Sequence, residues 1–184
     1  MMLALGLWFS NSPMPGTHHR DVVAMAVGLA DGDAQALFGF VRRLGLSDAQ
    51  ADDAVQETFV RLLTEYRRGI VIANPRAWAF RSIYRLAMDE HRLERRIRLL
   101  ADRLGSRGGG GIRPDPADRI AVWSEVDRLP ARQRQVIYLR YRADLTYEDI
   151  GQTLGITSSA ARSHATQAVE RLRLALDTGI EELT

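Results

Sequence analysis

A glycine- and proline-rich stretch at residues 105–116, GSRGGGGIRPDP, constrains the fold of this chain more than any other feature. Four consecutive glycines cannot hold a helix, and the two prolines that follow stop a helix from restarting. Helical patterns lie on both sides of the stretch. The sequence therefore predicts an all-α protein of two small helical domains. We expect domains at 20–104 and 120–184, a flexible linker at 105–119 and a loose N-terminal extension at 1–19.

The composition excludes several kinds of site. The chain contains no Cys, which excludes disulfides, Cys-ligated zinc, iron–sulfur clusters and a thiol nucleophile. No apolar run approaches the roughly 20 residues that a membrane-spanning helix needs. We therefore expect no cofactor and no direct membrane insertion. All 25 basic residues are Arg. Codon usage in a GC-rich genome is the simplest explanation, although the guanidinium group also suits contacts with phosphate and guanine.

The formal net charge is only +2, but the charges are unevenly distributed. Residues 20–66 hold four arginines and eight acidic residues, whereas residues 76–103 hold eight arginines and four acidic residues. Chance alone often produces such patches. The acidic and basic segments nevertheless suggest two different partner surfaces.

Residues 51–63 follow a helical pattern with two faces. The apolar stripe, which we expect to be buried, comprises Ala51, Val55, Phe59, Leu62 and Tyr66. The opposite face carries Asp53, Gln56, Glu57 and Thr64. Composition alone favours the interpretation that this polar face is exposed to solvent and has no binding role.

A second helix is predicted from Asn74-Pro75, an N-cap followed by a proline at the first helical position, to about Leu104. Five arginines fall within a sector of about 100° on this helix: Arg81, Arg85, Arg92, Arg95 and Arg96. Clustered cations repel one another unless they meet a polyanion. Nearby acidic residues could instead form surface salt bridges. The clustering slightly favours nucleic acid as the partner of this arginine face over a surface of salt bridges.

The C-terminal segment predicts a helix-turn-helix. Thr146 caps a short helix that carries Ile150 and Leu154, and a long helix capped by Ser158 or Ser159 follows the turn at 155–157. Small residues on the long helix allow a close crossing. Its outer face offers short polar side chains and arginine near a helix N-terminus, as recognition helices do. A generic helical hairpin is the alternative, but spacing, caps and side-chain size together favour DNA binding.

Three motifs in this order resemble the extracytoplasmic-function (ECF) group of bacterial sigma-70-type sigma factors. They are the segment 53–61 (DAVQETFVR), the segment 74–81 (NPRAWAFR), and the segment 145–156 (LTYEDIGQTLGI) followed by 168–173 (AVERLR). The resemblance covers residues 22–176, and the pattern of 74–78 is most similar to the iron-starvation branch. It implies a non-enzymatic bacterial cytoplasmic specificity subunit that binds core RNA polymerase and promoter DNA, usually under the control of an anti-sigma factor.

The resemblance also implies residue roles. The domain at 20–104 would contact the largest catalytic subunit of core polymerase through Asp53, Gln56, Glu57 and Arg61. It would hold the melted −10 element through Trp78, Arg81, Arg85, Asp89 and Arg92. The domain at 120–184 would recognise the −35 element through Ser159, Arg162, Ser163, His164, Gln167 and Arg171, and would rest on the second catalytic subunit. No catalytic or metal-binding residue is implied.

Two other interpretations compete with this one. The chain could be an autonomous helix-turn-helix regulator that binds duplex operator DNA as a dimer, but such a protein has no need of the acidic helix at 53–61. The other competing interpretation is an enzyme in which Asp52, Asp53 and Glu57 hold a metal ion. No His lies nearby in the sequence, and no phosphate-cradling glycine motif precedes a helix.

Overall fold

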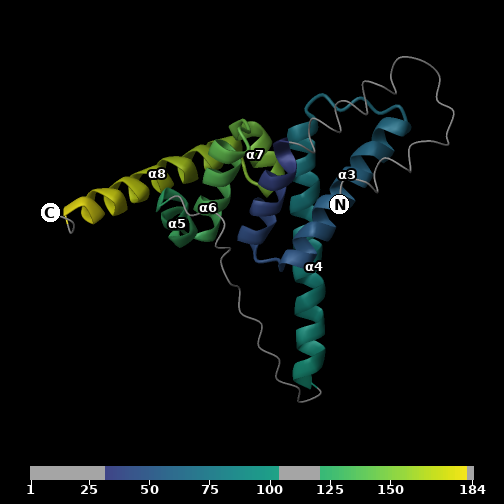
Figure 1. Ribbon diagram of the computed structural model, residues 1–184, viewed down its shortest axis with the longest axis horizontal. Helices are drawn as coiled ribbons and strands as arrows, with labels where there is room; N and C mark the ends of the chain where they lie inside the picture. The colour runs from purple at the N-terminus through teal and green to yellow at the C-terminus, as the bar shows by residue number, and fades with distance from the viewer. Residues whose placement is uncertain (1–31, 104–120, 182–184) are drawn as a thin grey trace.

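The computed structural model describes residues 32–103 and 121–181 (Figure 1). The predicted N-terminal extension at 1–19 and linker at 105–119 lie outside these residues. Every regular element in the two described ranges is a helix, and neither range contains a strand. The prediction of an all-α fold is confirmed.

The N-terminal unit, residues 32–103, contains a helix through residues 32–44, α3 (Asp48–Arg67) and α4 (Pro75–Arg103). Ser47 caps α3 in a reciprocal capping box, because its hydroxyl accepts from the Gln50 amide and the Gln50 side chain accepts from the Ser47 amide. Asn74 Oδ1 accepts from the Ala77 amide at 3.0 Å and so caps α4, as the Asn-Pro pair predicts.

The C-terminal unit, residues 121–181, contains α5 (Ala121–Arg128), α6 (Ala131–Ile137), the π-helical turn η1 (Tyr138–Arg142), α7 (Tyr147–Leu154) and α8 (Ser158–Glu181). The last two helices form the predicted helix-turn-helix. Ile150 and Leu154 of α7 are buried, together with Ala161, Ala165 and Ala168 of α8. Thr146 caps α7 as predicted. The cap of α8 is Thr157, whose hydroxyl accepts from the Ala160 amide at 3.1 Å, and not Ser158 or Ser159, which already lie inside the helix.

The buried stripe of α3 is rotated relative to the prediction. Its buried residues are Ala51, Ala54, Thr58, Leu62 and Leu63. Val55 and Phe59 are only partly buried at the edge of the core. Thr58 takes the central position because its hydroxyl donates to the Ala54 carbonyl at 2.8 Å, which satisfies the polar group inside the core. Periodicity alone did not predict a buried threonine there.

The two units share one hydrophobic core. The stacked rings of Phe40 and Tyr138, with centroids 5.6 Å apart, lie at its centre, and α7 packs against α4. In Figure 1, α3 lies on one side of α4 and the C-terminal unit on the other, while the far end of α4 extends beyond the body of the molecule. No helix within the described ranges combines the length and the apolar character that crossing a membrane requires.

Candidate functional site

The polar face of α3 brings the four predicted polymerase contacts together. Asp53, Gln56, Glu57 and Arg61 are all exposed. Arg61 Nε lies 2.7 Å from Glu57 Oε1, a pairing of residues four apart along the helix. The buried stripe behind this face anchors α3 on α4, so the four side chains point away from a fixed support. The arrangement offers carboxylate, amide and guanidinium groups to a protein partner.

The five residues of α4 that are assigned to the −10 element differ in their exposure to solvent. Trp78 and Arg81 are half-buried, and Arg81 Nε is a buried atom without a hydrogen-bond partner among the described residues. Arg85, Asp89 and Arg92 are exposed. Arg92 Nη1 lies 2.7 Å from Asp89 Oδ1, which holds one arginine beside a carboxylate. The spacing of three and four residues places all five on one side of the helix.

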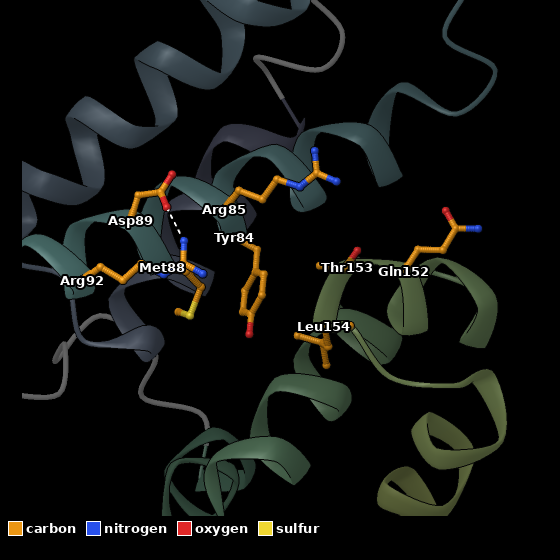
Figure 2. Close-up of a pocket in the computed structure, with 9 residues that line it drawn as sticks. Tyr84, Arg85, Met88, Asp89, Arg92, Gln152, Thr153 and Leu154 are labelled. Carbon is orange, nitrogen blue, oxygen red and sulfur yellow. Dashed lines mark hydrogen bonds and ion pairs between the residues drawn. The ribbon is translucent and has the colours of Figure 1, made fainter.

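This face borders a cavity of about 410 Å³ between the two units (Figure 2). Helix α4 contributes Tyr84, Arg85, Met88, Asp89 and Arg92, and the C-terminal end of α7 contributes residues 152–155. The Tyr84 hydroxyl accepts from Arg132 Nη1 of α6 at 3.2 Å. Tyr84 and Met88 were not among the residues predicted from the sequence. Their spacing of four on a helix is a signal for a shared face, but only the packing of α7 shows that the face borders a cavity.

The outer face of α8 carries the residues assigned to the −35 element. Ser159, Arg162, Ser163, Gln167 and Arg171 are exposed. His164 is half-buried, and its Nδ1 is enclosed without a hydrogen-bond partner among the described residues. Gln167 Oε1 accepts from Gln133 Nε2 of α6 at 3.1 Å. The structure therefore brings five of the six predicted residues to the surface and turns His164 partly inward.

A tyrosine that sequence analysis did not assign to the site supports Arg162. The guanidinium carbon of Arg162 lies 4.9 Å from the centroid of the Tyr147 ring, and that of Arg140 lies 5.2 Å from it. Arg140 Nη1 also donates to the Leu145 carbonyl at 2.9 Å. Cations are attracted to the face of an aromatic ring at such distances. Tyr147 stands in a quoted motif, but nothing in the sequence showed that α7 holds it under Arg162.

An ion pair connects the first helix with the start of α4. Asp33 of the first helix lies 3.0 Å from Arg76 Nε near the start of α4. Burial raises the pKa of the Asp33 carboxyl above its usual value, and the charges of Arg76 and Arg142 oppose part of that rise. Because Arg142 belongs to η1, this carboxylate is under the influence of both units. No cluster of acidic and histidine side chains in the described ranges has the arrangement of a metal site.

Comparisons with known proteins agree with this geometry. The Sigma-70 region 2 model matches residues 17–97, and the Sigma-70, region 4 model matches residues 126–174. The ECF RNA polymerase sigma factor SigL of Mycobacterium tuberculosis is 32% identical over 161 residues, which cover 83% of this chain and 89% of that protein. The chain belongs to the ECF group of the sigma-70 family. A further relative, SigK of Mycobacterium ulcerans, is 27% identical and covers 86% of this chain and 87% of its own length.

Solved structures share the fold of this sigma factor. The sigma factor RpoE from Bartonella quintana, solved in complex with the anti-sigma factor NepR, superposes with a TM-score of 0.60 at 23% identity and covers 84% of this chain and 97% of that one. CnrH, solved in complex with the cytosolic domain of CnrY, gives a TM-score of 0.53 at 23% identity and covers 88% and 99%. At this identity the likeness describes the fold alone.

As a sigma factor, the chain directs promoter-specific transcription initiation by binding core RNA polymerase and recognising −10 and −35 promoter elements. The matched regions lie on either side of the predicted linker. An autonomous regulator is not favoured, because a protein of that kind does not combine both regions. The finer resemblance to the iron-starvation branch is not confirmed by these relatives and stays a prediction.

Proposed function

We propose that the polar face of α3 is the surface that contacts the largest catalytic subunit of core polymerase. Four exposed polar side chains on one fixed helix support this assignment: Asp53, Gln56, Glu57 and Arg61. Helix α3 lies on the side of α4 away from the C-terminal unit (Figure 1), and the exposure of the four side chains leaves them accessible to a partner. This is the single observation that best supports a dedicated polymerase-binding face.

We further propose that α4 contacts the melted −10 element. Trp78 and Arg81 lie closest to the core, and Arg85, Asp89 and Arg92 continue along the same face into solvent. A partly exposed aromatic ring followed by arginines suits a single strand, which is bound by base stacking and by cations along its backbone. The cost of unstacking bases, a few kcal/mol, is offset by such contacts.

For the −35 element we propose that α8 enters the major groove of the duplex. The exposed residues Ser159, Arg162 and Ser163 lie near its N-terminus, where backbone N–H groups also favour phosphate. Arg162 has the donor fork that matches guanine, and Gln167 has an amide that matches adenine. Arg171 lies further along the helix, where a phosphate contact is the simpler role. His164, which is half-buried, is the weakest candidate of the set.

Several coarser features complete the proposal. We expect domains at 20–104 and 120–184, no catalytic activity of the chain's own, and a cytoplasmic location, because the polymerase it serves is there. We also expect an anti-sigma factor. RpoE and CnrH, which share the fold, were solved with proteins described as an anti-sigma factor or as the cytosolic domain of CnrY.

Run-off transcription with purified core polymerase and a library of genomic promoters tests the proposal. The sigma factor should yield transcripts from a small set of promoters that share −10 and −35 sequences, and core polymerase alone should yield none of them. Tight, specific duplex binding by the chain alone, with no promoter-dependent transcript from the mixture, would instead support the autonomous regulator.

A further inference from the structure

A buried glutamine of α6 holds the side chain of Gln167, one of the residues proposed to read the −35 element. Gln133 Nε2 donates a hydrogen bond to Gln167 Oε1, and the two atoms are 3.1 Å apart. Gln133 is only 5% exposed, whereas Gln167 is exposed on the outer face of α8. The bond therefore joins a side chain inside the C-terminal unit to one that reaches solvent.

The packing of α6 against α8 fixes the position of Gln133. Ile137 of α6 and Ala168 of α8 belong to one buried apolar cluster, and Ala168 directly follows Gln167. Gln133 lies four residues before Ile137 and so on the same side of α6. A side chain in close-packed surroundings keeps one rotamer. Gln133 therefore presents its amide to Gln167 from a fixed place.

The orientation of the Gln133 amide follows from what surrounds its other end. Gln133 Oε1 is enclosed and has no hydrogen-bond partner among the described residues. If the amide were turned round, the amino group would bring two donors to that enclosed position in place of one acceptor. An enclosed N–H group without a partner is rarer in proteins than an under-satisfied carbonyl oxygen. The amino group of Gln133 is therefore the end that faces Gln167.

This hydrogen bond decides which end of the Gln167 amide is available to DNA. An oxygen turned toward α6 leaves the amino group, on the other side of the amide carbon, pointing away from α6. The lone pairs of a carbonyl oxygen are grouped around the direction of its C=O bond, so this oxygen offers little to a base on the far side. A free glutamine amide presents one acceptor and one donor, which match adenine. Here the available end carries two N–H donors.

We propose that Gln133 is a positioning residue that makes Gln167 a donor-only reader of the −35 element. Guanine presents two acceptors, O6 and N7, on its major-groove edge, whereas adenine presents an amino group beside N7. At the base pair that Gln167 contacts, guanine is therefore favoured, and the amino group of adenine would meet another amino group. The inference rests on the proposed entry of α8 into the major groove, and it changes the base expected of Gln167 from adenine to guanine.

Exchange of side-chain amide protons with water, measured by NMR on the free full-length chain, tests the hydrogen bond without DNA. The amino protons of Gln133 should exchange slowly and those of Gln167 rapidly. Gln167→Ala should speed the exchange at Gln133, because the acceptor is lost. A protected amino group on Gln167 would show that its nitrogen, and not its oxygen, is engaged, and would overturn the proposal.

Base preference is measured as competition between promoter duplexes for the complex of this chain with core polymerase. The position at which Gln167→Ala alters base preference is located first, and guanine, inosine and adenine are compared there. The wild type should bind the guanine duplex about tenfold more tightly than the adenine duplex, within the range that one well-placed pair of hydrogen bonds contributes. Inosine should behave as guanine, because it keeps both O6 and N7.

Gln133→Met removes the donor and keeps a side chain of similar length. It frees Gln167 Oε1, so the preference for guanine should fall to about twofold, mainly because the adenine duplex is bound more tightly. A merely structural defect would weaken binding to every duplex alike. Because Gln167 is exposed, water can replace the lost hydrogen bond, and thermal unfolding should show little change.

Two further variants show whether Gln133 acts through Gln167. Gln135→Met is the matched control, since Gln135 is a second glutamine of α6 and accepts from Arg132 Nη1 of the same helix at 3.2 Å. It should leave base preference unchanged. In the Gln167→Ala background, Gln133→Met should have no further effect on preference.

The possible results separate this inference from the proposed function. A preference for adenine in the wild type, an unchanged preference for guanine in Gln133→Met, or an equal change in Gln135→Met would overturn the positioning role alone. Base preference unaffected by Gln167→Ala at every position would overturn both that role and the assignment of Gln167 to the −35 element. Absence of any complex with core polymerase would contradict the proposed function, and the exchange rates would still decide the hydrogen bond.

Discussion

Arg85 on α4 and Arg162 on α8 are both exposed arginines on faces assigned to DNA, but the structure supports them differently. Arg85 borders the cavity between the units and has no hydrogen-bonding or ion-pair partner among the described residues (Figure 2). Arg162 lies over the Tyr147 ring. A free arginine can follow a flexible single strand, whereas a held arginine presents its donor fork in one orientation. The difference indicates adaptable binding by the N-terminal unit and fixed readout by the C-terminal unit.

The same contrast extends to the protein-binding surface. The polar face of α3 consists of exposed side chains, two of which, Glu57 and Arg61, form an ion pair within the same helix. On the outer face of α8, two longer side chains have partners: Gln167 is engaged by Gln133, and Arg162 lies over the Tyr147 ring. We therefore expect substitutions in the N-terminal unit to change affinity broadly, and substitutions in α8 to change discrimination between sequences.

The largest effect is expected from the double substitution Gln56→Ala and Glu57→Ala. Loss of two central contacts should weaken binding to core polymerase by about 30-fold, the equivalent of a hot spot of about 2 kcal/mol. Fluorescence anisotropy with core polymerase measures this affinity. Glu170→Ala, on the exposed surface of α8, is the charge-removal control. An equal loss of isolated −35 duplex binding in the double variant would show that α3 has no separate role.

Arg162→Ala should reduce the binding free energy that discriminates between bases by about 1–3 kcal/mol at one position of the −35 element and by little at the others. The reason is that a fixed guanidinium makes its contact to a single base edge. Competition binding with duplexes substituted at each position measures the effect. A uniform loss across all sequences would mark Arg162 as a phosphate contact and would remove the contrast with Arg85.

Arg85→Ala should produce a smaller and uniform loss of affinity for a premelted −10 strand. The diagnostic result is salt dependence, since loss of one phosphate contact should reduce the slope of log affinity against log salt by about 0.7 for a single strand. Arg128→Ala, an exposed position of α5, should leave the slope unchanged. If Arg85→Ala changes preference at one base and leaves the slope unaltered, the arginine is a base reader and the comparison fails.

Tyr147→Leu should have the smallest effect, about 0.5–1 kcal/mol of discrimination at the position read by Arg162. Leucine retains apolar volume but lacks the ring face that attracts the guanidinium. Tyr147→Phe keeps the ring and should behave as wild type in the same competition assay. If both variants lose affinity equally at all positions, the hydroxyl contacts the DNA backbone and the ring does not position Arg162.

Sequence patterns predicted the local features well, because each depends on residues that are neighbours along the chain. The caps at Asn74 and Thr146 and the buried small residues of α8 follow from short-range chemistry and helical period. The contact of Tyr138 with Ala36 and the cavity between α4 and α7 join segments far apart in sequence. Neither periodicity nor charge specifies such pairings.

The candidate site shows the same limit. The polar residues of α3 and α8 could be assigned because they share a helix face, and most of them are exposed as expected. His164 is half-buried with an enclosed Nδ1, and the sequence of α8 alone does not reveal how far packing shields one residue of a polar face. Tyr147 was overlooked because its partners Arg140 and Arg162 come from two other elements.

Equilibrium binding of the intact wild-type chain to purified core RNA polymerase tests the central claim most directly. The account predicts saturable binding to core polymerase alone, and promoter selectivity only once the complex has formed. A chain that shows no affinity for core polymerase under conditions where it remains folded would contradict the account.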